Sequence, residues 1–252
     1  MTDRGTATGR PLAATLPGLL DARLATDPAS PLITFYDDAT GERTEVSGAT
    51  FANWVTKTAN LLVDGVGTTA GELAAVRLPV HWQSLVVVAA CWLADLIVEL
   101  DGSPGDEARA DGPPGARVGF AAERGQRPDT EDVVLLSLRP MGAPLLTADR
   151  TVIDYAAEVL AHGDRYQGQT ASASSHAVPG VSHQIVIAEA AASGIGGRIL
   201  LAPVGDPPLD RALLHTAYLG PLASGGSVVL VRNPDPGNLV RLAEAERATP
   251  YA

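Results

Sequence analysis

The segment between residues 73 and 100 constrains the fold more than any other part of the chain. Residues 73–78 and 96–100 are short apolar runs typical of buried strands. Between them, residues 82–94 are apolar on nearly every side and long enough to form a buried helix. A strand, a helix and a strand at this spacing form a βαβ unit, whose two strands lie parallel with a right-handed crossover. The chain is therefore expected to contain a parallel sheet.

Strand and helix patterns also alternate along the rest of the chain. Further strands are predicted at residues 32–36, 43–46, 117–120, 198–202 and 227–231, and another begins at residue 133. Further helices are predicted at residues 19–25, 47–65, 149–162, 182–193, 209–223 and 236–247. This alternation predicts an α/β fold with mostly parallel sheet layers and helices on both faces.

The size and composition of the chain fit one globular unit. It has 252 residues, of which 46% are hydrophobic and 19% charged, which is enough apolar material for a substantial core. We interpret residues 19–252 as a single α/β domain that follows a flexible N-terminal tail, residues 1–18. The connections near residues 101–116 and 163–180 are rich in proline, glycine and other small residues, so we expect both to be mobile.

Charge and hydropathy limit the partners and the location of the protein. The formal net charge of −11 weighs against nucleic acid or an anionic membrane as a partner. The longest apolar run, residues 85–100, contains Asp95 and Glu99 and is short for a membrane span. The single cysteine, Cys91, excludes a disulfide within the chain, and the N-terminus lacks the pattern of a signal peptide. We therefore expect a cytoplasmic protein without a membrane span.

The stretch of residues 133–146 has the position of a phosphate-binding loop. It consists of a predicted buried strand followed by a turn, and a helix pattern opens behind it at Asp149. In α/β proteins, backbone N–H groups and a helix N-terminus converge at such a point and bind phosphate. The chemistry differs here, because Pro140 and Pro144 have no N–H to donate and Gly142 is the only glycine of the turn.

Ser137, Arg139 and Gly142 are the candidate ligand-pocket residues of this turn. Ser137 and Arg139 follow the carboxyl end of a predicted strand, where ligands of open α/β sheets bind. The alternative is that Arg139 pairs with a nearby carboxylate. The carboxylates considered are those of Asp129, Glu131 and Asp132. We assign no catalytic residue.

Other chemically active side chains show no pattern typical of catalysis or metal binding. None of the histidines has the spacing of a metal site, so we expect surface or helix-capping roles for His81, His162, His176, His183 and His215. Cys91 lies on a predicted buried helix, where an apolar surround makes a thiol unreactive. The GIGG sequence at residues 194–197 follows a predicted helix, so we interpret it as a helix C-cap and not as a phosphate loop. We expect neither a cofactor nor a metal.

Asp206, Asp210 and His215 allow two interpretations. In the first, an acid–base pair forms where a predicted helix begins. In the second, Asp210 caps the helix that carries His215 and the other side chains are solvated. We expect the second.

Four segments resemble, in their order, the motifs of one large enzyme family. They are SGATF at residues 47–51, GELAAVRLP at residues 71–79, residues 93–101, and LGPLASGGSVV at residues 219–229. In these segments the chain resembles the N-terminal portion of the AMP-binding, adenylate-forming superfamily, which includes acyl-CoA synthetases and the adenylation domains of peptide synthetases. The similarity is scattered over roughly residues 19–249. It implies the N-terminal half of the adenylate-forming fold.

The phosphate-binding signature of that superfamily, roughly TSGTTGxPKG, is largely lost in this chain. Allowing one inserted residue, Ser137, Gly142 and Pro144 match its serine, one of its glycines and its proline. Its lysine and final glycine fall on the leucines at residues 145–146. A loop that wraps a triphosphate needs small residues for close backbone approach and many hydrogen-bond donors, so this turn is a poor cradle.

Three hypotheses for the function follow. We expect Met141 and Leu145 to block the turn. The resemblance implies that the motifs for adenine, ribose and magnesium, and the catalytic lid, would lie beyond Ala252. The favoured hypothesis is a non-catalytic binding, scaffolding or regulatory module that forms a homo-oligomer or binds a protein partner. The alternative is a reduced acyl-adenylating or acyl-CoA ligase-type enzyme that needs a partner to supply the lid. A third hypothesis is a sensor that keeps only the binding of a residual nucleotide or acyl ligand.

Overall fold

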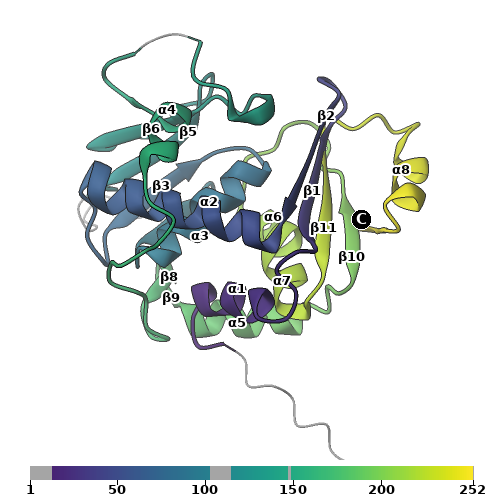
Figure 1. Cartoon of the computed structure of the whole chain (residues 1–252), viewed down its shortest axis with the longest axis horizontal. Helices are drawn as coiled ribbons and strands as arrows, with labels where there is room; N and C mark the ends of the chain where they lie inside the picture. The colour runs from purple at the N-terminus through teal and green to yellow at the C-terminus, as the bar shows by residue number, and fades with distance from the viewer. Residues whose placement is uncertain (1–12, 103–114, 147–148, 252) are drawn as a thin grey trace, which may run out of the picture.

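The computed structural model describes residues 13–102, 115–146 and 149–251. Two five-stranded sheets form its framework (Figure 1). Sheet 1 has the strand order β4-β3-β5-β6-β7, and all of its neighbouring strands are parallel. Its strands are β3 (Leu73–Arg77), β4 (Ile97–Leu100), β5 (Val118–Ala122), β6 (Asp132–Leu136) and β7 (Ile153–Asp154). The β3–α3–β4 segment is the predicted βαβ unit.

Sheet 2 has the order β12-β10-β11-β1-β2. Its strands are β1 (Pro31–Asp37), β2 (Glu42–Ser47), β10 (Arg198–Leu201), β11 (Ser227–Arg232) and β12 (Thr249–Tyr251). Only the pairing of β1 with β2, the predicted hairpin, is antiparallel among the pairs of this sheet. The two sheets confirm the predicted α/β class with mostly parallel strands.

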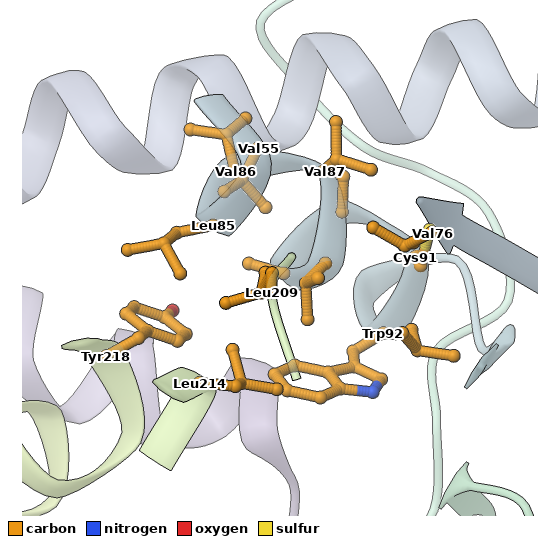
Figure 2. Close-up of a cluster of buried hydrophobic side chains, with 14 of the residues drawn as sticks. Val55, Val76, Leu85, Val86, Val87, Cys91, Trp92, Leu209, Leu214 and Tyr218 are labelled. Atoms are coloured by element: carbon orange, nitrogen blue, oxygen red, sulfur yellow. The ribbon is translucent and has the colours of Figure 1, made fainter. Parts of the chain in front are cut away.

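The main hydrophobic core lies between the two sheets. Helices α2 (Gly48–Asn60) and α3 (Trp82–Leu93) run through this space, as Figure 1 shows. Figure 2 shows side chains of α3 packed against Val55 of α2 and Tyr218. Every residue from Trp82 to Trp92 is buried, which explains why the sequence of α3 is apolar on all sides. Helix α8 (Leu239–Ala245) covers the opposite face of sheet 2 through a smaller apolar cluster.

The remaining elements are short. They are α1 (Leu16–Leu24), the π-helix η1 (Leu61–Val66), the 3₁₀ turn η2 (Pro140–Gly142), α4 (Tyr155–Glu158), the 3₁₀ turn η3 (Val159–Ala161), β8 (His176–Val178), β9 (Val181–Ser182), α5 (His183–Ala192), α6 (Arg211–Leu214), the π-helix η4 (His215–Leu219) and α7 (Gly220–Ser224). None of the helices in the described ranges is long and apolar enough to cross a membrane.

Helix α2 begins where the sequence predicts. The hydroxyl of Ser47 accepts a hydrogen bond from the Thr50 N–H at 3.1 Å, as an N-cap residue does. The helix continues through η1 and ends at Gly67, whose φ of 79° is left-handed. The end lies two residues beyond Gly65, the glycine that the sequence pattern suggested.

The predicted N-terminal tail extends too far into the domain. Helix α1 begins at Leu16, capped by Thr15, so residues 16–18 are helical. The Leu16 side chain is buried in the main core, because it packs with the helices between the sheets. Residues 1–12 of the predicted tail and residues 103–114 of the predicted 101–116 connection lie outside the described residues.

The helix predicted at residues 149–162 begins too early, because only residues 155–161 are helical, as α4 and η3. The Asp149 side chain accepts hydrogen bonds from the Thr151 N–H and hydroxyl, which makes a turn and not a helix cap. The β-branched residues that follow favour an extended backbone, and Ile153 and Asp154 form β7 beside β6. Asp154 is the actual N-cap of the short helix α4. The predicted 163–180 loop is likewise shorter, because β8 forms within its last residues and pairs with β9 just beyond it.

A charged network fixes the end of α8 to sheet 2. Arg198 of β10 donates through Nη2 to the Glu246 carboxylate at 2.6 Å and through Nε to the Glu246 carbonyl at 2.9 Å. The Tyr36 hydroxyl also donates to this carboxylate, and Arg43 lies 3.3 Å from it. Burial opposes ionisation of Glu246, but hydrogen bonds from Tyr36, Arg198 and Arg43 outweigh it and lower the pKa of the carboxyl group.

This network predicts a specific acid sensitivity. Because the folded-state pKa of Glu246 lies below its ordinary value of 4.5, its ionisation stabilises the fold above that pH, and the stabilisation is lost as pH falls through the folded-state value. Glu246→Gln should lower the free energy of unfolding at pH 7 by roughly 1–2 kcal/mol and flatten its decline in acid. Urea unfolding at several pH values measures both. The control Glu244→Gln, an exposed residue on α8, should resemble wild type; an equal effect of both variants would contradict the assignment.

Candidate functional site

The carboxyl ends of strands from both sheets border one large cleft. Its volume is about 1100 Å³. Its lining includes Arg77 at the end of β3, Glu123 after β5 and Ser137 after β6 from sheet 1, and Arg232 of β11 from sheet 2. Ligands of parallel α/β sheets bind at this edge, so the cleft is the candidate functional site.

Ser137 and Gly142 are engaged within the turn that follows β6, which we call the 137–146 turn. The Ser137 hydroxyl donates to the Ala143 carbonyl and accepts from the Arg139 N–H at 3.3 Å. The Gly142 N–H donates to the Arg139 carbonyl at 3.0 Å, and Gly142 has a left-handed φ of 63°. The structure therefore places Ser137 in the cleft lining. Gly142 instead supplies the left-handed backbone conformation that the turn requires.

Arg139 lines the cleft but pairs with Glu123, which is not one of the three carboxylates expected from the sequence. Its guanidinium donates to the Pro144 carbonyl, and its Nη2 lies 3.9 Å from Glu123 Oε2. The predicted partners Glu131 and Asp132 contact Arg117 instead. Glu123 reaches Arg139 because β5 and β6 are hydrogen-bonded neighbours, so their carboxyl ends lie side by side.

Two carboxylates hold the backbone of the distal half of the turn. The Leu145 N–H donates to Asp154 Oδ2 at 2.9 Å, and the Leu146 N–H donates to Glu123 Oε1 at 2.6 Å. Asp154 belongs to β7 and Glu123 follows β5, the two strands on either side of β6. Sequence reasoning missed both residues, although each is an acidic residue at the end of a predicted or actual strand.

The 137–146 turn is thus closed by hydrogen bonds within the protein. Two of its backbone N–H groups donate to carboxylates, and its two prolines have no N–H to offer a ligand. A carboxylate at this place also repels a phosphate by like charge. The sequence predicts that Met141 and Leu145 block the turn. The Met141 side chain lies outside the described parts of the structure. The closing interactions that the structure describes come from Glu123, Asp154 and Ser137.

The guanidinium groups of the cleft are largely paired. Arg77 lies 2.6 Å from Glu99 and 3.5 Å from Asp101. Arg232 lies 2.5 Å from Asp206, whose hydrogen bond raises the pKa of the guanidinium. Arg124 is exposed, and no partner for it is found within the described ranges. The cleft therefore offers alternating charges and not the concentrated positive charge that a triphosphate requires.

The buried histidines have structural roles. His81 Nδ1 accepts from the Gln83 N–H at 3.1 Å and caps α3, and burial lowers the pKa of its imidazole to about 3. His183 Nδ1 accepts from the Leu16 N–H at 3.2 Å, and burial lowers its pKa to about 4. Both rings are therefore neutral at physiological pH. Within the described residues, no three His, Cys, Asp or Glu side chains gather closely enough to hold a metal ion.

The other candidate residues are separated from one another. Asp206 pairs with Arg232, Asp210 caps α6 through the Leu213 N–H at 2.8 Å, and His215 lies 3.6 Å from Glu189. The capping interpretation of Asp210 is confirmed. Gly194 follows α5 with a left-handed φ of 69°, which confirms the predicted C-cap. Cys91 is fully buried, and burial raises the pKa of its thiol, as expected for a structural cysteine.

A comparison with known proteins identifies the family. A protein of Mycobacterium tuberculosis described as a TIGR03089 family protein is 37% identical over 249 residues, and the match covers 92% of this chain and 95% of that protein. The chain belongs to the TIGR03089 family. No family model matches it.

Solved structures confirm the fold of this TIGR03089 protein. An acyl-CoA synthetase from Brucella canis is 17% identical with a TM-score of 0.69, and the match covers 98% of this chain and 48% of that one. An acetoacetyl-CoA synthetase from Streptomyces lividans is 15% identical with a TM-score of 0.66, covering 93% and 41%. The N-terminal subdomain of NpsA from Klebsiella oxytoca is 16% identical with a TM-score of 0.62, covering 93% and 58%. The fold is that of the N-terminal portion of adenylate-forming enzymes, and the chain spans about half the length of these structures.

Removal of the Ser137 hydroxyl tests the internal bonding of the turn. Ser137→Ala deletes the bonds to the Ala143 carbonyl and the Arg139 N–H, so it should cost about 1 kcal/mol of stability and accelerate hydrogen exchange at the Arg139 amide. NMR-detected exchange measures the second effect. Ser174→Ala, at an exposed serine, should leave that amide unchanged, and unchanged exchange in Ser137→Ala would refute the assigned bonds.

Proposed function

We propose that this TIGR03089 protein is a non-catalytic binding module with the adenylate-forming fold, acting in scaffolding or regulation. The observation that supports this proposal is the occupation of the 137–146 turn by the protein's own carboxylates. The cleft at the carboxyl ends of the strands is its proposed ligand site. The proposed ligand is a nucleotide or an acyl compound, held without chemical conversion.

Adenylation makes demands that this turn does not meet. Transfer of AMP to a carboxylate passes through a highly charged transition state, which requires preorganised donors and positive charge. The loss of one such donor typically lowers kcat about 100- to 1000-fold. Here Glu123 and Asp154 take up two backbone donors and bring negative charge to the same place.

The size of the cleft and one solved complex support ligand binding. A volume of about 1100 Å³ is sufficient for a nucleotide-sized molecule. The N-terminal subdomain of NpsA was solved in complex with 3-hydroxybenzoyl-AMSN. We infer that this fold can hold a ligand, although the present chain spans 58% of the NpsA subdomain.

A reduced acyl-adenylating enzyme is the second candidate. It is favoured by the position of the cleft and by the Ser137 hydroxyl, which lies at the end of β6 in the cleft lining. Such an enzyme must open the 137–146 turn to bind a triphosphate.

Pyrophosphate exchange separates the two candidates. The purified protein, incubated with ATP, magnesium and a panel of carboxylic acids, should incorporate no labelled pyrophosphate into ATP, because the turn cannot stabilise the transition state. An intact acyl-CoA synthetase serves as the positive control. Carboxylate-dependent exchange above background would overturn the non-catalytic proposal. Thermal-shift titration with ATP, AMP and CoA measures binding separately, because a ligand of the folded state raises Tm.

The proposal includes a homo-oligomer or a protein partner. Large apolar side chains are exposed on several elements: Leu146, Leu160, Ile185, Val204, Val240 and Tyr251. Burial of such side chains favours association. Light scattering of the purified protein should give a mass that increases with concentration or equals a dimer. A strict monomer that captures no partner would contradict this part of the proposal.

A further inference from the structure

We propose that the Leu146 N–H and the Arg139 guanidinium form a small oxyanion site and that the Glu123 carboxylate is its built-in ligand. While Glu123 occupies the site, free phosphate and phosphate monoesters are excluded; when its charge is removed, they bind. This inference rests on the proposed function, since it treats the 137–146 turn as a site that no substrate phosphate uses.

The geometry of Glu123 is that of a bound anion. Its Oε1 accepts from the Leu146 N–H at 2.6 Å, and its Oε2 lies 3.9 Å from Arg139 Nη2. One carboxylate therefore faces a backbone donor with one oxygen and a guanidinium with the other. Backbone N–H groups and guanidinium groups are the donors that proteins use for phosphate oxygens.

The backbone around Glu123 holds its side chain in place. The Glu123 N–H donates to the Leu136 carbonyl at 2.8 Å, which joins the end of β5 to the end of β6. The Gly125 N–H donates to the Ala122 carbonyl at 2.8 Å and closes the next turn. Because both flanks are fixed, the carboxylate has a high effective concentration at the site and competes strongly with free anions.

Asp154 has a different role, although it also accepts a hydrogen bond from the turn. Its Oδ1 accepts from the Ala156 and Ala157 N–H groups at 3.0 and 3.4 Å, so it caps α4. Its removal would disturb a helix as well as the turn. The side-chain contacts of Glu123 within the described ranges all go to the turn. Glu123 is therefore the carboxylate that can be neutralised without loss of a helix cap.

The site fits a compact tetrahedral oxyanion. The Leu146 N–H is hydrogen-bonded to one oxygen of the Glu123 carboxylate, and the Arg139 guanidinium, which also donates to the Pro144 carbonyl, lies 3.9 Å from the other oxygen. The same two groups can contact two oxygens of a phosphate group. With Glu123 ionised, a phosphate would lie against a like charge, which disfavours binding. Inorganic phosphate and the phosphate group of a nucleotide monophosphate share this chemistry, and separate titrations distinguish them.

Glu123→Gln tests the proposal, because it keeps the shape and the acceptor oxygen but removes the charge. Inorganic phosphate and AMP are titrated separately into ¹⁵N-labelled protein, and the Leu146 amide resonance is followed. With inorganic phosphate, wild type should show no saturable shift of this resonance, whereas the variant should bind phosphate at least about tenfold more tightly, the effect of one charge-assisted hydrogen bond. With AMP, the measure is the gain of the variant over wild type, because the cleft itself is the proposed nucleotide site. If only the affinity for inorganic phosphate increases in the variant, the ligand of the site is the free anion. If the affinity for AMP increases as well, the site also accepts a phosphate monoester.

The matched control is Glu131→Gln. It makes the same change of net charge in the segment that links β5 and β6, but Glu131 lies 3.5 Å from Arg117 and not at the turn. It should behave like wild type. An equal gain in both variants, no gain in Glu123→Gln, or tight phosphate binding by wild type at the Leu146 amide would each overturn the proposal.

Two further measurements keep the test decisive. Circular dichroism checks that the variant is folded; if Glu123→Gln is not, Glu123→Ala is titrated in its place with the same expected gain. Pyrophosphate exchange is measured on the same wild-type sample. Exchange would overturn the proposed function, whereas absent exchange together with no gain in phosphate affinity would overturn only the assignment of Glu123 as the built-in ligand.

Discussion

The site depends on the parallel pairing of β5, β6 and β7. Parallel strands end at the same edge of a sheet, so residues that follow these strands are forced together. Glu123 after β5, the turn after β6 and Asp154 in β7 meet for this reason. In many α/β proteins this edge of the sheet presents hydrogen-bond donors to a phosphate. In this protein the same edge places two carboxylates against the N–H groups of the turn. The side chains at the carboxyl ends of these three strands therefore determine whether this part of the cleft offers hydrogen-bond donors or acceptors.

Much of the fold could be predicted because its signals are local and strong. The apolar run of α3 between two short strands specified the β3–α3–β4 unit, and Ser47 specified the start of α2. Weaker elements escaped prediction. Strand β12 is three exposed residues long, so its sequence carries no burial pattern. The Asp149 turn resembles a helix start because the same side chain can cap a helix or close a turn.

The position of the site could be predicted, but its interactions could not. Ser137 and Arg139 line the cleft because they follow a strand, and their role in binding a ligand stays a prediction. Their partners depend on sheet order and register, which bring Glu123 to a backbone N–H 23 residues away. A sequence shows that the turn has few donors. It does not show that acidic side chains from two neighbouring strands take up donors that remain.

The most direct test of this account is a crystal structure of the TIGR03089 protein grown with millimolar ATP and magnesium. The account predicts that the Leu145 and Leu146 N–H groups still contact Asp154 and Glu123, and that no phosphate oxygen lies within hydrogen-bond distance of the 137–146 turn. A triphosphate held by that turn, with the two carboxylates turned away, would contradict it.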